Sequence, residues 1–224
     1  MFKFSNLVML VRDYWQVFLL EGVKYTLILS AIAVIFGVII GSFVAFGRLS
    51  KYRIIRWICE AYTELIRGTP LLLQLYLFVL VLPNIFSGIL HLSQFSWIAV
   101  SLCFNSGAYV SEIIRSGIQS VDKGQMEAAR SLGMNQSQTM MRVIMPQAIK
   151  NILPAIGNEF VSVIKETSMA STFFVGDLMT SYLKVKGATY LAFECLIIVA
   201  VIYFVLTFTL SKLIGIYERR LNKA

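Results

Sequence analysis

The chain has 224 residues, of which 58% are hydrophobic and only 14% charged, and its mean hydropathy is +0.75. A water-soluble core of this size could not hide so much apolar surface, so the composition predicts an integral membrane protein. The net charge of +8 would suggest nucleic acid as a partner of a soluble protein. Here we expect no nucleic acid, because the basic residues follow the pattern of membrane-orientation signals.

The first twenty residues place apolar side chains such as Phe4, Leu7, Val11 and Phe18 at helical spacing. We expect an amphipathic helix on the outer membrane interface that leads into the first span. Arg12 interrupts the apolar run, and Asp13 and Glu21 do the same, so the segment does not resemble a cleavable signal peptide.

Long uncharged stretches predict the membrane spans. The stretch from Gly68 to Ser111 has 44 residues without a charged side chain, which as helix is about twice the thickness of the hydrocarbon core. It must therefore hold two spans, with a turn between Leu82 and Gly88. The sequence predicts a single all-α membrane domain over residues 1–224. Its five transmembrane helices are expected at about residues 22–47, 60–82, 94–117, 152–175 and 190–216.

Basic residues gather on one side of this five-span arrangement. They follow span one, fill the segment between spans three and four, and end the chain, and they make up 13 of the 20 lysines and arginines. The positive-inside rule then places the amino terminus outside and the carboxyl terminus in the cytoplasm. These clusters are interpreted as orientation signals rather than binding patches.

A polar segment at about residues 121–150 interrupts the membrane-like sequence. Glu127 is expected to begin a short helix, where its charge favours the helix dipole, and Gly133 to end it in a left-handed conformation. Asn135 and Gln138 then have the spacing of a capping box for a second helix, which Pro146 is expected to stop. The pattern favours a helix-turn-helix finger on the cytoplasmic face, although an ordinary interfacial loop is an alternative.

Residues of other chemistries are few. Cys59, Cys103 and Cys195 stand alone in apolar surroundings without metal-ligand spacing, so we expect buried free thiols and no metal site. The one histidine, His91, lies in the expected external turn. A nucleophile with a base is therefore missing, and the sequence offers no catalytic residues for an intramembrane protease.

The polar segment resembles a known motif. Residues 127–146 read EAA-x3-G-x9-VIMP, which is similar to the EAA loop of the ABC-importer permeases, E-A-A-x3-G-x9-I-x-L-P, with Val143 and Met145 as departures. Further segments resemble the branch that transports polar amino acids: ELIRGTPLLLQ at 64–74, AYVSEIIRSGI at 108–118, PQA at 146–148, KETS at 165–168 and YERRL at 217–221. Together they cover nearly the whole chain.

This resemblance implies the permease subunit of an ATP-driven amino-acid importer with a type I fold. The sequence has no G-x-x-x-x-G-K-[ST] phosphate loop, so ATP and Mg are expected on a partner ATPase and no cofactor on this chain. The family's EAA helix docks in a groove of the ATPase and couples its closure to alternating access. The implied coupling residues are Glu127, Ala128, Ala129, Leu132 and Gly133.

The resemblance also implies a second permease chain, identical or paralogous, and an extracellular or periplasmic binding protein, in the inner membrane of a bacterial cell. The amino acid is left open, with cationic or amphoteric ones such as arginine, histidine, lysine, glutamine or cystine preferred. On residue chemistry alone, an ATP-independent carrier or channel is the main alternative, and a structural membrane subunit is the third.

Candidate substrate contacts are polar groups inside the spans, where an ionisable side chain is costly and usually faces a cavity or a partner. Glu159 is the strongest candidate, because its carboxylate could hold the cationic group of an amino acid. An interhelical hydrogen bond is the competing interpretation for such residues. The full candidate set is Glu159, Asn105, Thr69, Gln74, Ser162 and Tyr109.

Overall fold

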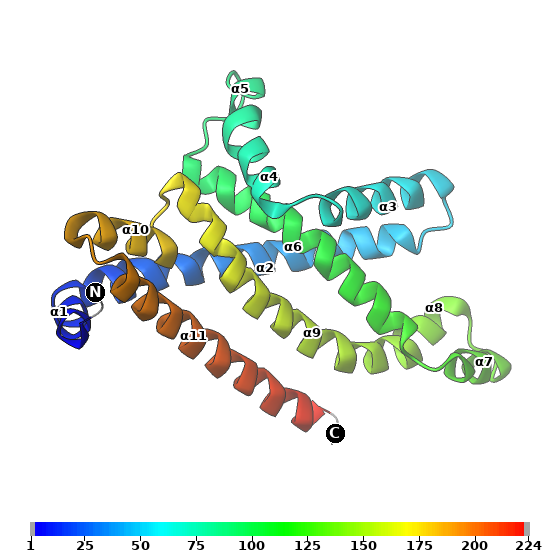
Figure 1. The fold of residues 1–224 in the computed structure, drawn as a ribbon. Coiled ribbons are helices and arrows are strands. Elements are labelled where there is room, and N and C mark those ends of the chain that lie inside the picture. The colour runs from blue at the N-terminus through cyan, green and yellow to red at the C-terminus, as the bar shows by residue number, and fades with distance from the viewer. Residues whose placement is uncertain (1–2, 222–224) are drawn as a thin grey trace.

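The computed structural model describes residues 3–221, and this part of the chain folds into helices without a β-strand. Its long helices form a bundle, with a pair of short helices at one end and the polar finger at the opposite end (Figure 1). The bundle consists of α2 (Lys24–Arg48), α6 (Gln94–Gln119), α9 (Met145–Glu166) and α11 (Ala192–Leu221). The end helices are α1 (Phe4–Trp15) and α10 (Leu178–Thr189), and the finger consists of α7 (Lys123–Ser131) and α8 (Gln136–Thr139).

Helices α2 and α6 are the central pair, and small residues let their backbones approach closely. A Cβ atom added at Gly41 would lie 2.8 Å from the carbonyl oxygen of Gly107 and from Val110, and one at Gly37 would lie 2.7 Å from the hydroxyl of Ser106. Small residues at the contact are typical of membrane helix pairs, in which van der Waals packing drives association. The two helices run parallel, because Gly37 faces Ser106 and Gly41, one turn further along α2, faces Gly107 and Val110.

The amino-terminal segment is helical, as predicted. Helix α1 continues through a π-helical stretch, Gln16–Val23, into α2, so that Phe4–Arg48 is one helical run of 45 residues. Its buried residues Leu10 and Phe18 pack with residues of α10 and α11. The position of α1 at an outer membrane interface stays a prediction.

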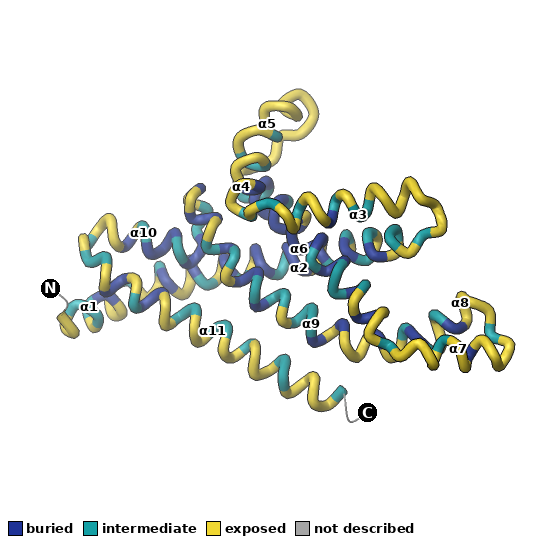
Figure 2. Tube along the Cα trace, turned by 45° about the vertical axis from the view of Figure 1, so that its right-hand side comes forward, coloured by how far each residue is buried: buried dark blue, intermediate teal, exposed yellow. Residues whose placement is uncertain are grey.

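The prediction that residues 60–82 form one continuous helix was wrong. The structure has α3 (Arg53–Arg67), α4 (Leu71–Tyr76), the π-helical turn Leu77–Val81 and α5 (Leu82–Ile85), and the two halves are bent by 104°. The break falls at Gly68-Thr69-Pro70, where Pro70 is extended and begins the new helix. Proline lacks the amide hydrogen and disfavours helix at the preceding residue, so α3 cannot continue. Helix α4 packs on the bundle through the buried Leu75, whereas α5 projects from it in both views (Figures 1 and 2).

The remaining spans agree more closely with expectation. Helix α6 matches span 94–117, and α11 begins two residues after the predicted 190 and ends at Leu221. Helix α9 begins before the predicted residue 152, and a 3₁₀ helix, Thr167–Phe173, continues it. Among residues 3–221, three helices are long and apolar enough to cross a membrane, and the bent pair is a fourth candidate. The count of five spans therefore stays a proposal.

Helix α10 was not predicted from the sequence. Asp177 caps its start by accepting a hydrogen bond from the main-chain N–H of Met179 at 2.9 Å. Tyr190 ends it in the left-handed conformation, with φ +57°. The cysteines are free thiols as expected, with Cys103 and Cys195 buried and Cys59 partly buried.

Candidate functional site

The finger begins earlier in the chain than the sequence pattern indicated. Helix α7 starts at Lys123, and the carboxylate of Asp122 caps it by accepting from the main-chain N–H of Gly124 at 2.7 Å. Glu127 therefore lies in the middle of α7 and is exposed, so its expected place at the helix start was wrong. The carboxylate of Asp122 thus occupies the helix start, where the charge of Glu127 was expected to act.

Gly133 ends α7 as predicted. Its φ is +82°, and the N–H of Met134 donates to the carbonyl of Ala129 at 3.2 Å while the N–H of Gly133 donates to Arg130 at 3.0 Å. These two bonds are the Schellman motif, which needs a left-handed residue at this position. Within the described part of the chain no atom lies within 4 Å of a Cβ built on Gly133, so the left-handed backbone conformation is the reason for glycine here.

The second helix of the finger starts with the predicted capping box. Asn135 accepts from the N–H of Gln138 at 2.9 Å, and the side chain of Gln138 accepts from the N–H of Asn135 at 3.0 Å. The predicted stop at Pro146 was wrong, because helix runs from α8 through the π-helical turn Met140–Ile144 into α9. A wider π turn directly before the proline accommodates its ring and its missing donor.

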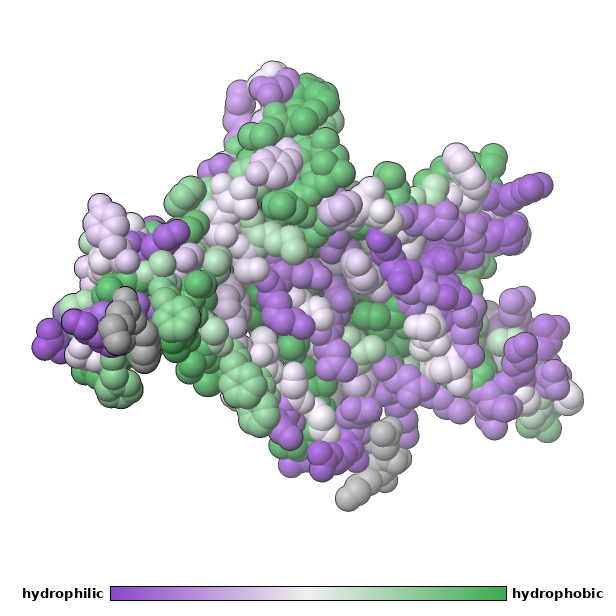
Figure 3. Space-filling view, in the orientation of Figure 1, coloured by the Kyte–Doolittle hydropathy of each residue, from purple (hydrophilic) through white to green (hydrophobic). Residues whose placement is uncertain are grey.

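The predicted coupling residues divide between two surfaces of α7. Ala129 is buried, whereas Glu127 and Ala128 are exposed and Leu132 is 85% exposed at the tip. The inner side of the finger packs on α6 through Ile118 and its neighbours and leaves a groove of about 770 Å³. Figure 3 shows hydrophilic residues over much of this end of the molecule. An exposed leucine on a rigid, polar finger is a suitable contact for a partner's apolar groove.

Three of the candidate substrate residues meet at the break in the second membrane segment. The amide nitrogen of Gln74 donates to the carbonyl of Ile66 at 2.7 Å, the carbonyl of Thr69 at 3.1 Å and the hydroxyl of Thr69 at 3.0 Å. The amide of Asn105 in α6 donates to the oxygen of Gln74 at 3.0 Å. The network satisfies carbonyl groups that the break leaves free.

Glu159 lies in a different place from this network. The hydroxyl of Ser106 in α6 donates to its carboxylate at 3.1 Å, which makes a contact between α6 and α9. Asn105 and Ser106 are consecutive in a helix and point about 100° apart, so the two polar groups occupy different sides of α6. Ser162 is partly buried on α9, one turn after Glu159. The structure therefore separates Glu159 and Ser162 from the network around Gln74.

Tyr109 belongs to a third cluster, which centres on Glu112. Its ring lies 5.5 Å from the guanidinium of Arg67, and Glu112 accepts from Arg48 at 2.7 Å and pairs with Arg115. Tyr109 was predicted only as a candidate substrate contact, and the cluster around Glu112 was not predicted. The three arginines lie on three different helices, so a one-dimensional pattern could not bring them together.

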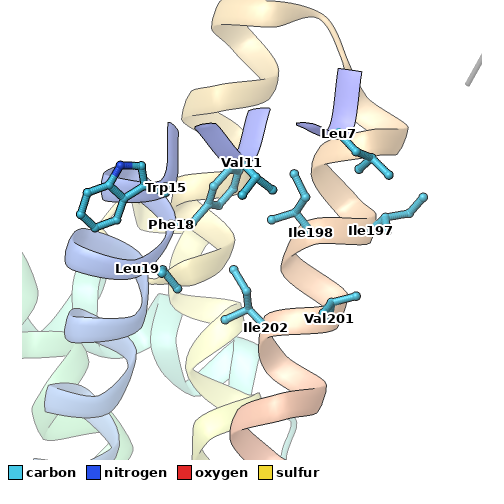
Figure 4. A pocket seen from close by; sticks show the side chains of 9 residues that line it. All are labelled: Leu7, Val11, Trp15, Phe18, Leu19, Ile197, Ile198, Val201 and Ile202. Atoms are coloured by element: carbon cyan, nitrogen blue, oxygen red, sulfur yellow. The ribbon is translucent and has the colours of Figure 1, made fainter. Parts of the chain in front are cut away.

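A large apolar hollow lies near the opposite end, between the first helical run and α11 (Figure 4). Its volume is about 340 Å³, and every residue that lines it is apolar or aromatic. Without polar groups to orient an amino acid, it is no substrate site of the kind described above. The lining residues are Leu7, Val11, Trp15, Phe18, Leu19, Ile197, Ile198, Val201 and Ile202.

The fold is that of an ABC type I permease. A solved structure described as an amino acid ABC transporter with histidines superposes with a TM-score of 0.90 at 43% identity, covering 98% of this chain and 99% of that chain. The MetNI methionine ABC transporter in an inward-facing conformation has the same fold, with a TM-score of 0.77 at 18% identity. A membrane-embedded transport subunit is thus the class that the bundle and its finger define.

The family follows from the sequence comparison. A family model described as "Binding-protein-dependent transport system inner membrane component" matches residues 37–223, and this chain belongs to that family. The arginine transport system permease protein ArtQ of Bacillus subtilis is 41% identical, covering 92% of this chain and 93% of that protein. The putative glutamine transport system permease protein GlnP of Rickettsia bellii is 42% identical, covering 91% and 93%. The L-cystine transport system permease protein TcyB of B. subtilis is 38% identical, covering 95% and 89%.

Proposed function

We propose that this chain is the permease subunit of an ATP-driven importer that carries a polar amino acid into the cell by alternating access. The observation that carries the proposal is the identity of about two residues in five over nearly the full length of permeases for arginine, glutamine and cystine. The exposed EAA finger supports it, because that surface has no packing role that would explain Leu132.

Coupling to the ATPase is assigned to the finger. Asp122, Gly133 and Asn135 fix its two helices by caps, so a force on the tip reaches α6 and α9 without unwinding the finger. Leu132 would enter an apolar groove of the ATPase, and Glu127 and Ala128 would border it. ATP and Mg belong to that partner in this scheme.

The chain would cross the membrane five times, with the broken segment as span two and α9 with its 3₁₀ extension as span four. The amino terminus would then lie outside and the finger in the cytoplasm, in the inner membrane of a bacterial cell. A second permease chain, identical or paralogous, would complete the pathway. A binding protein on the outer side would deliver the amino acid.

Glu159 is proposed to contact the cationic group of the amino acid. Its carboxylate has one hydrogen-bond donor from the protein among the described residues, Ser106, and keeps further acceptor capacity. The polar side chains at the break already bond with one another, because Gln74 donates to the hydroxyl of Thr69 and accepts from the amide of Asn105. Their proposed role is therefore to hold the broken helix beside the pathway.

Uptake by purified components tests the proposal. The permease, its ATPase and its binding protein are reconstituted in liposomes, and uptake of radiolabelled arginine, glutamine, histidine, lysine and cystine is measured with ATP or with ion gradients alone. The proposal expects uptake of at least one amino acid that needs ATP. Uptake that survives without the ATPase and collapses with the ion gradient would instead establish the carrier alternative.

The substitution Leu132→Ser tests the coupling surface in the same preparation. Leu132 is 85% exposed, so its loss should leave the bundle intact while ATP-dependent uptake falls at least tenfold. Ile89→Ser is the matched control, because Ile89 is 80% exposed on the loop after α5, far along the chain from the finger. Equal uptake by both variants would remove Leu132 from the coupling contact.

A further inference from the structure

A cluster of three arginines surrounds a single carboxylate within the bundle. Glu112 of α6 accepts from Arg48 at the end of α2 at 2.7 Å, pairs with Arg115 one turn further along α6, and lies 3.8 Å from the guanidinium of Arg67 at the end of α3. The cluster carries two positive charges in excess. Glu64 lies one turn before Arg67, but it makes no ion pair within 4.0 Å of any described residue.

The cluster lies where α2 and α3 end, beside a part of α6 that continues further. Glu112 precedes the end of α6 by seven residues, which is about 10 Å of helix. Because Gly41 faces Gly107 and the helices are parallel, Arg48 begins beyond Glu112 and its side chain points back toward the bundle interior. The side chains of Arg48 and Glu112 are only 16% and 21% exposed, and an excess of partly buried charge is costly unless water or an anion accompanies it.

Arg48 and Arg67 have N–H donors that Glu112 does not accept from. The Nε atom of Arg48 is buried without a hydrogen-bond partner among residues 3–221, and that side chain is only 16% exposed. Arg67 lies 3.8 Å from Glu112, beyond hydrogen-bond distance, and its guanidinium lies over the ring of Tyr109 at 5.5 Å from the centroid, while its side chain is 42% exposed. A planar guanidinium held on an aromatic face presents its N–H groups in a fixed direction, which suits a carboxylate or phosphate.

We propose that Arg67 and Arg48, beside Tyr109 and Glu112, form a binding site for a single oxyanion, which the α-carboxylate of the transported amino acid occupies on its way to the cytoplasm. This inference rests on the proposed import of an amino acid. The site is complementary to Glu159, because one takes the carboxylate and the other the cationic group. A lipid headgroup phosphate has the same chemistry and is the other source of the anion.

The test compares an amino acid with its decarboxylated amine on the purified complex of permease and ATPase. The probes are arginine with agmatine, or glutamine with 4-aminobutanamide, whichever amino acid the wild-type complex binds. We expect the amine to bind about tenfold more weakly than the amino acid. Arg67→Gln should lower the affinity for the amino acid about tenfold and leave the amine unchanged, because a charge-assisted hydrogen bond of this kind is lost only for the ligand that has a carboxylate.

Two further variants distinguish loss of the anion contact from a general structural effect. Arg67→Lys retains the charge and should restore part of the affinity. Arg53→Gln removes an arginine from the opposite end of the same helix and should have no effect. An equal loss for amino acid and amine in Arg67→Gln would show a structural role, and unchanged binding of both would also overturn the proposal.

A second binding experiment distinguishes the substrate carboxylate from a lipid phosphate as the bound anion. Binding is repeated in nanodiscs of phosphatidylcholine with and without phosphatidylglycerol. If the wild type needs phosphatidylglycerol, and Arg67→Gln removes that need without changing the preference for the carboxylate, the lipid occupies the site and the assignment to the substrate fails. If the wild-type complex binds neither arginine nor glutamine and imports no amino acid, the proposed function itself fails, which is a distinct outcome.

Discussion

The side-chain amide of Gln74 donates to the main-chain carbonyl of Ile66 at 2.7 Å, across the break that divides the second membrane segment. The same nitrogen reaches the carbonyl and the hydroxyl of Thr69, and its oxygen accepts from Asn105 of α6. One buried glutamine thus replaces the helical hydrogen bonds that Pro70 prevents and ties the break to α6. Because these contacts engage both ends of its amide, Gln74 suits a structural role better than a substrate-binding role.

Replacing this glutamine should destabilise the bundle. Gln74→Leu keeps similar volume but leaves the Ile66 and Thr69 carbonyls without their donor, at a cost of about 1–3 kcal/mol for each group left unsatisfied. The measurement is thermal unfolding of the purified protein in detergent. Gln16→Leu is the control, because Gln16 is exposed in the first helical run. A variant with wild-type stability and lost substrate binding would show that Gln74 is a ligand instead.

The turn at Gly133 should be needed for coupling and not for folding. Valine at φ +82° is strained by about 1–3 kcal/mol, although its side chain would have free space. Because the turn is exposed at the tip of the finger, local rearrangement of the finger should relieve this strain. Gly133→Val should then leave the melting temperature of the bundle nearly unchanged while uptake per ATP hydrolysed falls severalfold. Gly215→Val provides the comparison, since its site in α11 is equally open and its φ is ordinary. Normal uptake by Gly133→Val would contradict the coupling assignment.

Close packing of α2 on α6 should be sensitive to a single methyl group. Gly41→Ala would push a Cβ to 2.8 Å from the Gly107 carbonyl oxygen and from Val110, so the two helices must separate. Overpacking of this kind costs about 1–3 kcal/mol, and the unfolding temperature should fall accordingly. Gly187→Ala in α10 meets no atom within 4 Å and should cost much less. Equal stability of both variants would show that the helix pair adjusts freely.

Glu159→Gln tests the proposed cation contact. Glutamine can still accept from Ser106, so the contact between α6 and α9 should persist. If the carboxylate holds a cationic group, uptake of arginine or lysine should lose about tenfold in apparent affinity, and uptake of glutamine should change less. Glu218→Gln, at an exposed position near the end of α11, serves as the control. Unchanged affinity for every amino acid would remove Glu159 from the substrate site.

Local patterns were sufficient for much of the finger. The Schellman turn at Gly133 and the capping box of Asn135 and Gln138 depend on residues within six positions of one another, and such signals are visible in a sequence. The start of α7 was misplaced because Asp122, five residues before Glu127, provides the cap. Pro146 was misread because a π-helical turn before it lets the helix continue.

The sequence by itself determined the membrane character, the order and approximate positions of the long helices, and the resemblance to a permease family, since hydrophobic length and motif spacing are properties along the chain. Only the tertiary structure decided the 104° bend, the network around Gln74, the division of the candidate substrate residues and the three arginines on Glu112. Each of these depends on side chains from separate helices meeting across an interface. Their distances are fixed by helix packing and not by sequence separation.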